Sequence, residues 1–371
     1  MPLEPTINAA LSDLFEKNGH ETVEPPVLQP ADVFLDLAGE DIRRRLFLTT
    51  GEDGRDICLR PDFTIPVSRL YLQRGKAGRA AKYSYNGLIF RQRPGHSGEI
   101  PQAGAEILGM TEREQADAQI LILAQEAAKA AGQKEATIRI GDEAVFTALL
   151  EALGLPIVWR RRLRDLFGER ERLDKAIARM AGDGRRSDEN MGFLAALEGA
   201  DPDAAVTVVE DLLSIAGIST VGGRTAHEIS ERFLEQAALA SGVGVSQGAA
   251  DTLTRFLNIS GPADQAVEKL SEFALSEKLN LSVPLERFER RIDLLRAGGI
   301  EPKNLSYAAD FGRRLDYYTG FVFELHNPHD SGGQPVIGGG RYDLLVRLLG
   351  AEKDVPAVGF SMWLDRMNEK G

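Results

Sequence analysis

Polar and aromatic side chains gather near the C-terminus, in the stretch 312–343 (GRRLDYYTGFVFELHNPHDSGGQPVIGGGRYD). Its β-branched and aromatic residues predict a strand over 315–325, whose side chains alternate between two faces. One face carries two carboxylates, a phenol and a glycine: Asp316, Tyr318, Gly320, Val322 and Glu324. Such a face suits the floor of a small polar pocket, with Gly320 leaving room for a ligand. An antiparallel hairpin with a glycine bulge would explain the backbone of this stretch, but not its hydrogen-bonding side chains.

The elements around this stretch indicate a core that is interrupted by an insertion. Ile7, Leu11, Leu14 and Phe15 follow helical spacing, which predicts an opening helix that ends at Gly19. The further expected elements are strands at 47–50, 56–59, 83–91, 102–109 and 136–140, and helices at 65–72 and 143–153. Short helices and glycine-interrupted loops follow. We therefore expect an α+β fold with core parts at 1–155 and 286–371 and a mostly helical insertion domain at 156–285.

Composition places the chain among ordinary globular proteins. Its 371 residues are 43% hydrophobic and contain no apolar run of the roughly 18 residues that a membrane helix needs. The single cysteine, Cys58, excludes an internal disulfide and favours a reducing cytoplasm. A net charge of -12 lowers the expectation of a large phosphate-contacting surface. The composition therefore predicts a cytoplasmic protein without a membrane partner, and a local basic groove that binds nucleic acid stays possible.

Two signatures in the polar stretch resemble those of histidyl-tRNA synthetases. The first is RRLDYYTG, which begins at Arg313, and the second is GGGRYD, which ends at Asp343. They are specific to histidyl-tRNA synthetases rather than general to class II synthetases. The resemblance implies a class II aminoacyl-tRNA synthetase-like core, in which an antiparallel sheet is flanked by helices.

A second matching segment follows the short strand at 56–59. The sequence LRPDFT resembles the segment in which an acid and a threonine of the synthetase hold the histidine α-amino group. The resemblance implies that Asp62 and Thr64 do so here, although the family normally carries glutamate at the first position. Either residue could also cap the following helix, and the two roles are compatible.

The segment 82–109 resembles motif 2 of class II synthetases. Gln102 and Glu106 match the residues that contact the histidine side chain, and Arg91 matches the first motif arginine. An adenylating enzyme also needs arginines in the intervening loop to neutralise ATP phosphates. Here Arg91-Gln92-Arg93 lacks the family's glutamate, and GHSGEIP carries no arginine. The amino-acid half of the site is retained, whereas the nucleotide half is altered.

The segment 357–366 resembles motif 3 and shows the same asymmetry. Its arginine, Arg366, is present. The synthetase has glycines where Ser361 and Trp363 stand, and those glycines let the adenosine lie against the backbone. The family also continues into an anticodon-binding domain of on the order of 100 residues. The sequence stops at Gly371 without one, so we expect no tRNA binding and no aminoacylation.

We predict a histidine-binding site without catalytic residues, cofactor or metal. The resemblance implies that Asp62 holds the ligand ammonium, that Arg313 holds its carboxylate, and that Glu106, Gln102 and Tyr318 surround the imidazole. The full predicted set is Asp62, Thr64, Arg91, Gln102, Glu106, Arg313, Tyr317, Tyr318 and Tyr342. His326 and His329 could form a metal pair, but their spacing falls in a predicted turn without a nearby cysteine.

The combination of a retained histidine site and altered nucleotide motifs resembles the regulatory subunits of ATP phosphoribosyltransferase, over the whole chain. That family joins a short-form catalytic subunit in the first step of histidine biosynthesis, supports its activity and takes part in feedback inhibition by histidine. We expect these two partners, free histidine and the catalytic subunit, together with a class II-like self-dimer. A truncated synthetase-like enzyme that adenylates histidine is the alternative.

Overall fold

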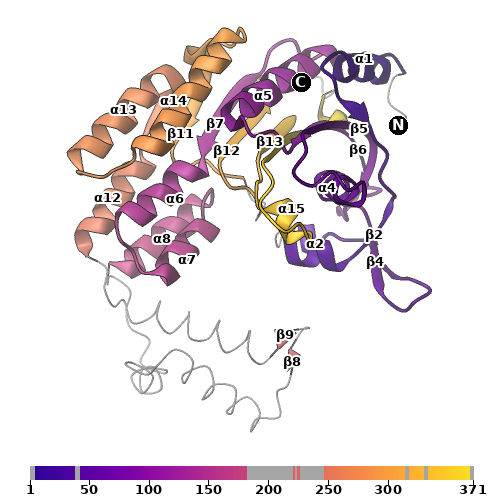
Figure 1. The fold of residues 1–371 in the computed structure, drawn as a ribbon, viewed down its shortest axis with the longest axis horizontal. Coiled ribbons are helices and arrows are strands. Elements are labelled where there is room, and N and C mark those ends of the chain that lie inside the picture. The colour runs from indigo at the N-terminus through magenta and orange to yellow at the C-terminus, as the bar shows by residue number, and fades with distance from the viewer. Residues whose placement is uncertain are drawn as a thin grey trace. The chain divides into compact units, whose positions relative to one another are not determined.

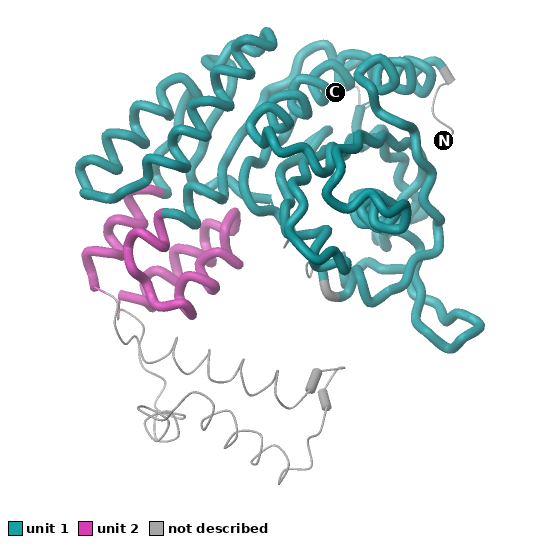
Figure 2. Tube along the Cα trace, viewed as in Figure 1, with its two compact units in different colours: residues 1–148, 257–371 teal, residues 149–256 magenta. Residues whose placement is uncertain are grey.

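The computed structural model describes residues 5–37, 42–181, 220–221, 224–225, 246–313, 317–329 and 333–367. The chain divides into two compact units, shown in Figure 2. One comprises residues 1–148 and 257–371, and the other comprises residues 149–256. The insertion was expected to end at 285. The boundary instead falls at 257, because the helices between 263 and 297 pack in the first unit, against its sheet and its long helix.

A nine-stranded sheet forms the centre of the first unit (Figure 1), in the order β1-β5-β6-β14-β13-β12-β7-β11-β10. Its pairs are antiparallel except β1–β5 and β7–β11, which are parallel. The strands are β1 Glu21–Thr22, β5 Ala81–Phe90, β6 Glu99–Leu108, β7 Thr137–Asp142, β10 Ser260–Pro262, β11 Leu305–Ala308, β12 Phe321–His326, β13 Ile337–Arg341 and β14 Ala357–Trp363. This architecture matches the expected α+β class.

The helices and a small sheet complete the two units. The helices of the first unit are α1 Pro5–Lys17, α2 Asp32–Leu37, α4 Thr64–Gln73, α5 Arg113–Ala130, α13 Ala263–Ser276, α14 Ser282–Ala297 and α15 Leu345–Leu348. Its second sheet has the order β2-β4-β3, with β2 Leu28–Pro30, β4 Asp56–Leu59 and β3 Leu48–Thr50. Helix α6 Glu143–Ala152 leads into the second unit, which contains α7 Ile157–Asp165, α8 Arg170–Met180, β8 Thr220–Val221, β9 Arg224–Thr225 and α12 Gln247–Leu257.

Helix α1 packs its apolar face inward. Leu11 and Phe15 are buried, and the Phe15 ring lies 6.2 Å from the ring of Phe360 on β14. Gly19 follows the helix with φ +76°, a left-handed conformation that favours glycine after a helix. The predicted opening helix is therefore present. Its buried residues belong to the core of this chain.

The glycine run in β13 allows close packing instead of forming a bulge. Residues 337–340 pair in unbroken register with β12 on one side, and residues 337–341 pair with β14 on the other. A Cβ atom on Gly339 would lie 2.6 Å from the Phe323 ring, and one on Gly340 would lie 2.8 Å from the Tyr318 ring. Both distances are too short for a methyl group. The alternative of a glycine bulge is therefore wrong, and β13 is a regular strand whose neighbours fill the space beside its glycines.

The strand expected over 315–325 begins later. β12 starts at Phe321, and Tyr317 and Tyr318 precede it outside regular secondary structure. Asp316 lies outside the described residues. Gly320 was expected to leave room for a ligand, but a Cβ there would meet Arg341 at 3.5 Å, an ordinary packing contact. The prediction that side chains alternate between two strand faces is thus wrong for the residues before Phe321.

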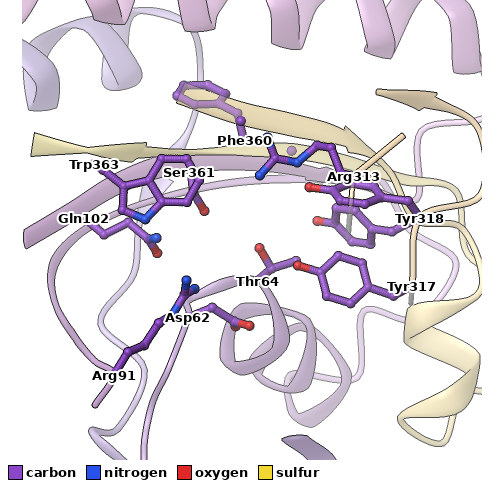
Figure 3. A pocket seen from close by; sticks show the side chains of 13 residues that line it. Asp62, Thr64, Arg91, Gln102, Arg313, Tyr317, Tyr318, Phe360, Ser361 and Trp363 are labelled. Carbon is purple, nitrogen blue, oxygen red and sulfur yellow. The ribbon is translucent and has the colours of Figure 1, made fainter. Parts of the chain in front are cut away.

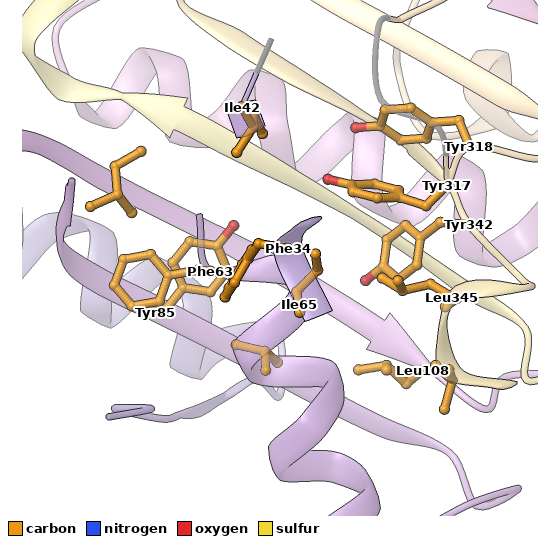
Figure 4. Close-up of a cluster of buried hydrophobic side chains, with 14 of the residues drawn as sticks. Phe34, Ile42, Phe63, Ile65, Tyr85, Leu108, Tyr317, Tyr318, Tyr342 and Leu345 are labelled. Carbon is orange, nitrogen blue, oxygen red and sulfur yellow. The ribbon is translucent and has the colours of Figure 1, made fainter. Parts of the chain in front are cut away.

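A core of aromatic and aliphatic side chains lies where α4, α15 and the sheet meet (Figure 4). Phe63 and Tyr85 stack with ring centroids 4.4 Å apart, and the Tyr317 ring meets the Tyr342 ring edge-on at 5.8 Å. Several of these rings carry hydroxyl groups, so the core offers polar atoms where it borders the space above β14.

A buried ionic network joins α5, α14, β7 and β13. Asp117 accepts hydrogen bonds from Arg341 at 2.6 Å and from Arg291 at 2.8 Å, and Arg291 also donates to Asp142 at 2.7 Å. All four side chains are at most 6% exposed. Arg341 also donates to Asp343 at 2.8 Å. Each buried charge therefore has an opposite charge within hydrogen-bond distance, as burial requires.

In the part of the chain that the structure describes, no helix is long and apolar enough to cross a bilayer.

Candidate functional site: a polar pocket over the central sheet

A polar pocket lies between the start of α4 and the centre of the large sheet (Figure 3). Asp62 and Thr64 reach it from the start of α4, Gln102 from β6, and Arg313 from the segment before β12. The complete lining is Asp62, Thr64, Arg91, Gln102, Arg313, Tyr317, Tyr318, Gly338, Tyr342, Gly359, Phe360, Ser361 and Trp363. Eight of the nine predicted site residues are thus brought together from both parts of the core.

Glu106 is the predicted residue that does not line the pocket. Its carboxylate is fully buried behind it and accepts hydrogen bonds from three hydroxyl groups. Thr64 donates at 2.9 Å and Tyr85 at 3.4 Å, and Tyr342 donates through a short bond. Since Thr64 and Tyr342 line the pocket, Glu106 acts on its contents through these hydroxyls rather than by direct contact.

Two glycines give these buried groups their space. A Cβ on Gly359 would overlap the Glu106 carboxylate, which faces it across the β14–β6 pair. A Cβ on Gly338 would overlap the guanidinium of Arg313. Any side chain at either position would displace the Glu106 carboxyl group or the Arg313 guanidinium, so the glycine pattern of β13 and β14 serves the pocket as well as the sheet.

Several polar atoms at the pocket have no hydrogen-bond partner among the described residues. They are Asp62 Oδ2, Gln102 Oε1 and Nε2, Arg313 Nε, and Trp363 Nε1. Gln102 is fully buried and Asp62 is 4% exposed. A buried polar group without a partner costs roughly 1–3 kcal/mol. The pocket therefore favours a ligand that offers both donors and acceptors.

Burial raises the pKa of both carboxyl groups at the site, Asp62 and Glu106. It raises the pKa of Asp62 to about 6, although the positive charge of Arg91 and a hydrogen bond from the Ile65 backbone N–H oppose the shift. It raises the pKa of Glu106 to about 8, against the hydrogen bonds from Tyr342 and Thr64. At neutral pH Asp62 is therefore mainly ionised, whereas Glu106 is mainly protonated.

Asp62 also has a structural role in the pocket wall. Its Oδ1 accepts a hydrogen bond from the backbone N–H of Ile65 at 3.2 Å, in the first turn of α4. The helix-capping role and a ligand-facing role are compatible, as the sequence suggested, because Oδ2 is left without a partner among the described residues. The cap fixes the carboxylate at the rim.

The pocket is narrow in this structure. The volume open to the centre of a water molecule is about 20 Å³, within an envelope of about 340 Å³ of empty space. The smaller figure corresponds to roughly one ordered water. A ligand of amino-acid size therefore requires the lining side chains to move apart.

The side of the pocket expected to hold a nucleotide is filled by an indole. Trp363 is 6% exposed, and the guanidinium of Arg366 lies 4.3 Å from its ring centroid. Arg366 also donates to the Pro335 carbonyl at 2.6 Å. Burial lowers its pKa to about 10, and the positive charges of Arg91, Arg93 and Arg313 act in the same direction. Trp363 thus takes up space next to the arginine cluster.

Sequence reasoning missed several residues of the site. Phe360 and Ser361 line the pocket, and Tyr85 bonds both Ser361 at 2.9 Å and Glu106. Ser361 and Trp363 had been identified only as replacements on the nucleotide side. The alternation of β14 gives a signal for Ser361 and Trp363, which share one strand face with Gly359. No local pattern identifies Tyr85.

The possible metal pair is not assembled. His326 Nε2 lies 3.1 Å from Glu324 Oε2, and the backbone N–H of His329 donates to Asn327. Across the described ranges, no group of three or more His, Cys, Asp or Glu side chains could hold a metal ion.

Comparison with known proteins shows the family of this chain. A family model described as Histidyl-tRNA synthetase matches residues 4–208 and 204–367. Proteins named ATP phosphoribosyltransferase regulatory subunit from Brucella ovis and Brucella abortus are each 42% identical over 366 residues, covering 98% of this chain and 96% of theirs.

Solved structures show the same fold at lower identity. A Bacillus halodurans protein described as an ATP phosphoribosyltransferase regulatory subunit/histidyl-tRNA synthetase superposes with a TM-score of 0.65 at 20% identity, over 97% of this chain and 77% of that chain. Histidyl-tRNA synthetase from Nostoc gives a TM-score of 0.63 at 18% identity, over 97% and 69%. These matches confirm the class II synthetase-like core.

The full-length likeness to the Brucella proteins shows to which group within this family the chain belongs, since their name is that of a regulatory rather than a catalytic subunit. The chain therefore belongs to the histidyl-tRNA synthetase-like family, among the regulatory subunits of ATP phosphoribosyltransferase.

Proposed function

We propose that this chain binds free histidine in the polar pocket, and that it joins a short-form ATP phosphoribosyltransferase catalytic subunit, supports that subunit's activity and conveys feedback inhibition by histidine. The observation that carries the histidine part is the pocket itself, where an acid, an arginine and an amide converge with unpartnered polar atoms. The partner follows from the name of relatives that are 42% identical over nearly the full length.

The chemistry of the lining matches an amino acid with a polar side chain. The ionised Asp62 carboxylate would accept from the α-ammonium, and Arg313 would donate to the carboxylate, both as charge-assisted hydrogen bonds. Gln102 carries one acceptor and two donor protons, so it can serve either nitrogen of a neutral imidazole. Tyr318 would pack beside the ring. Glu106 would support Thr64 and Tyr342 from behind.

Binding in this pocket would also require a change of shape, because only about 20 Å³ is open to the centre of a water molecule. A ligand that selects an opened arrangement can alter the equilibrium between two states of the complex only if it binds one of them more tightly. Coupling of roughly 1–3 kcal/mol is typical of such regulation. The narrowness of the pocket thus supports a regulatory role for its occupancy.

Two measurements test the proposal. Calorimetric titration of the chain with L-histidine should show saturable binding, and absence of binding would contradict the histidine part. Phosphoribosyl transfer should be measured for a short-form catalytic subunit with and without this chain. We expect activity only with the chain, and inhibition by histidine that is weaker in Asp62→Ala. If the catalytic subunit is fully active alone, the partner part is wrong.

We further propose that the chain forms a dimer, as class II-like cores do. Helix α1 and the segment at Pro25 and Pro26 resemble the dimer interface of class II synthetases, and Ile7 and Leu14 on α1 are only half-buried. Exposed apolar side chains also occur near the small sheet: Val27, Leu28, Leu48 and Leu88. Sedimentation at micromolar concentration should show at least a dimer, and Leu28→Lys should weaken it. A monomeric parent chain would contradict this proposal.

The alternative, an enzyme that adenylates histidine, finds less support. Trp363 takes up space beside Arg366, where a nucleotide was expected to lie. We therefore propose that the chain neither binds tRNA nor activates histidine, and that it acts in the cytoplasm, where its thiol at Cys58 would stay reduced. Histidine-dependent exchange of pyrophosphate into ATP above background would favour the enzyme instead.

A further inference from the structure

Arg313 is held from outside the pocket by a residue that does not line it. Its Nη1 donates to Glu324 Oε1 at 3.0 Å, and the two side chains are 10% and 18% exposed. The guanidinium lies 5.8 Å from the ring centroids of both Tyr318 and Trp363. The Tyr318 side chain also shares a hydrogen bond with Arg313. The bond to the Glu324 carboxylate is charge-assisted on both sides, so it is the stronger of the two directional contacts that fix the plane of the guanidinium.

Glu324 is itself fixed on both of its oxygens. Oε1 accepts from Arg313, and Oε2 lies 3.1 Å from His326 Nε2 on the same strand. Across the sheet, Glu324 faces Gly338 on β13 and Arg139 on β7. The absence of a side chain at Gly338 leaves the path along which the Arg313 guanidinium extends. Arg139 in turn lies 3.8 Å from Asp310.

This arrangement determines which edge of Arg313 remains for a ligand. A guanidinium binds a carboxylate best through two parallel N–H groups. With Nη1 bonded to Glu324, the edge that includes Nε remains, and Arg313 Nε has no partner among the described residues. The bond to Glu324 therefore leaves the edge carrying Nε available to a ligand in the pocket that Arg313 lines.

We infer that Glu324 is a positioning residue that orients Arg313 for the carboxylate of the amino-acid ligand, so that it sets the preference for ligands that carry a carboxylate. This inference rests on the proposed histidine pocket. It assigns to Glu324 an effect through Arg313 alone, because the Glu324 side chain does not line the pocket.

The test compares two substitutions that remove the same charge. Glu324→Gln keeps an oxygen that accepts from Arg313, whereas Glu324→Ala loses it. The change in electrostatic repulsion on a ligand carboxylate is shared by both variants and cancels in their comparison. We expect calorimetric affinity for L-histidine to be at least about tenfold lower in Glu324→Ala than in Glu324→Gln.

Histidinol, which has an alcohol in place of the carboxylate, separates positioning from general damage. The two variants should bind histidinol within about threefold of each other, because no carboxylate meets Arg313. When Arg313 is also replaced by alanine, Glu324→Gln and Glu324→Ala should bind L-histidine with equal affinity. Asp310→Ala and Asp310→Asn are the matched control pair, since Asp310 pairs with Arg139 near Glu324 without a bond to Arg313. This pair should bind both ligands like the parent chain.

The outcomes are distinct. If the parent chain binds histidine but the Gln and Ala variants have equal affinity, or lose histidine and histidinol equally, the inference about Glu324 is overturned and the pocket proposal stands. If the parent chain binds neither ligand, the pocket proposal fails, and the positioning role fails with it. Thermal unfolding of each variant excludes loss of fold as the cause.

Discussion

Asp62 and Arg313 line the same pocket from opposite sides, and each is held by a partner of its own (Figure 3). The backbone N–H of Ile65 donates to Asp62, and Arg313 donates to Glu324. The negative and positive groups are thus fixed apart instead of neutralising each other. Such a separation complements a zwitterion, whose ammonium and carboxylate are also held apart by covalent structure.

Removing the Asp62 carboxylate should weaken histidine binding more than removing the Gln102 amide. Asp62→Ala leaves a partly buried ammonium unpaired, with an expected loss of about 2–5 kcal/mol. Gln102→Ala removes a neutral partner, with an expected loss of about 1–2 kcal/mol. Calorimetric titration measures both. Equal affinities for the parent chain and Asp62→Ala would place the ligand elsewhere.

Histidine affinity should fall as the pH is lowered through 6. Burial raises the pKa of Asp62 to about 6, so the acceptor for the ammonium is lost by protonation below that pH. Between pH 7 and pH 5 we expect about a tenfold loss of affinity from this group. Histidine itself titrates in the same range, so the affinity of the parent chain is divided by that of Asp62→Asn at each pH. A ratio that does not change with pH would contradict the assignment of Asp62.

Glu106→Gln should change how stability depends on pH. Burial raises the pKa of Glu106 from 4.5 to about 8, so the folded state binds this proton more tightly than the unfolded state. The free energy of unfolding of the parent chain therefore falls as the pH rises from about 4.5 to about 8, by up to about 1.4 kcal/mol per pH unit. A glutamine does not titrate and lacks this slope.

Denaturant unfolding at several pH values measures the difference between Glu106→Gln and the parent chain. As the pH rises from about 4.5 to about 8, the free energy of unfolding of Glu106→Gln should increase relative to that of the parent chain. Glu99→Gln makes the same change at an exposed position of the same strand and serves as the control. Parallel pH profiles for the parent chain and Glu106→Gln would show that the buried carboxyl group does not titrate as described.

Arg291→Met should destabilise the fold strongly without touching the pocket. It would leave Asp117 and Asp142 with one fewer cation in the buried network, at an expected cost of about 3–5 kcal/mol. Arg296→Met on the same helix removes an exposed pair with Asp293 and should cost no more than about 1 kcal/mol. Denaturant unfolding compares the two. Similar small losses would mean that the buried network contributes little.

The sequence predicts the elements of the site where local chemistry determines them. Asp62 ahead of a helical pattern indicated the start of α4 and a side-chain bond to its first turn. The helix begins at Thr64, and Asp62 accepts from the backbone N–H of Ile65, although the residue at the N-cap position is Phe63. Strands β5 and β6, which carry Gln102 and Glu106, follow their β-branched and aromatic composition. These predictions succeed because propensity, pattern and tertiary packing agree there.

Other features depend on contacts between distant segments. Tyr317 and Tyr318 have strand-like composition, but both rings turn into the pocket, where Tyr342 and Arg313 pack on them. Asp117 gave no local signal because its partners come from β13 and α14, far away in the sequence. Periodicity describes which face of one element is buried, and it is silent on which other element covers that face.

The position of β14 has a consequence for how the chain folds during synthesis. It is the last strand along the described chain, yet it lies between β13 and β6 at the middle of the large sheet. Until β14 has left the ribosome, β13 and β6 both present unpaired edges, which are prone to wrong pairing. The pocket lacks Gly359, Phe360, Ser361 and Trp363 during the same interval. Competence to bind a ligand would therefore coincide with completion of the sheet, and a nascent chain would be most vulnerable to aggregation just before it becomes functional.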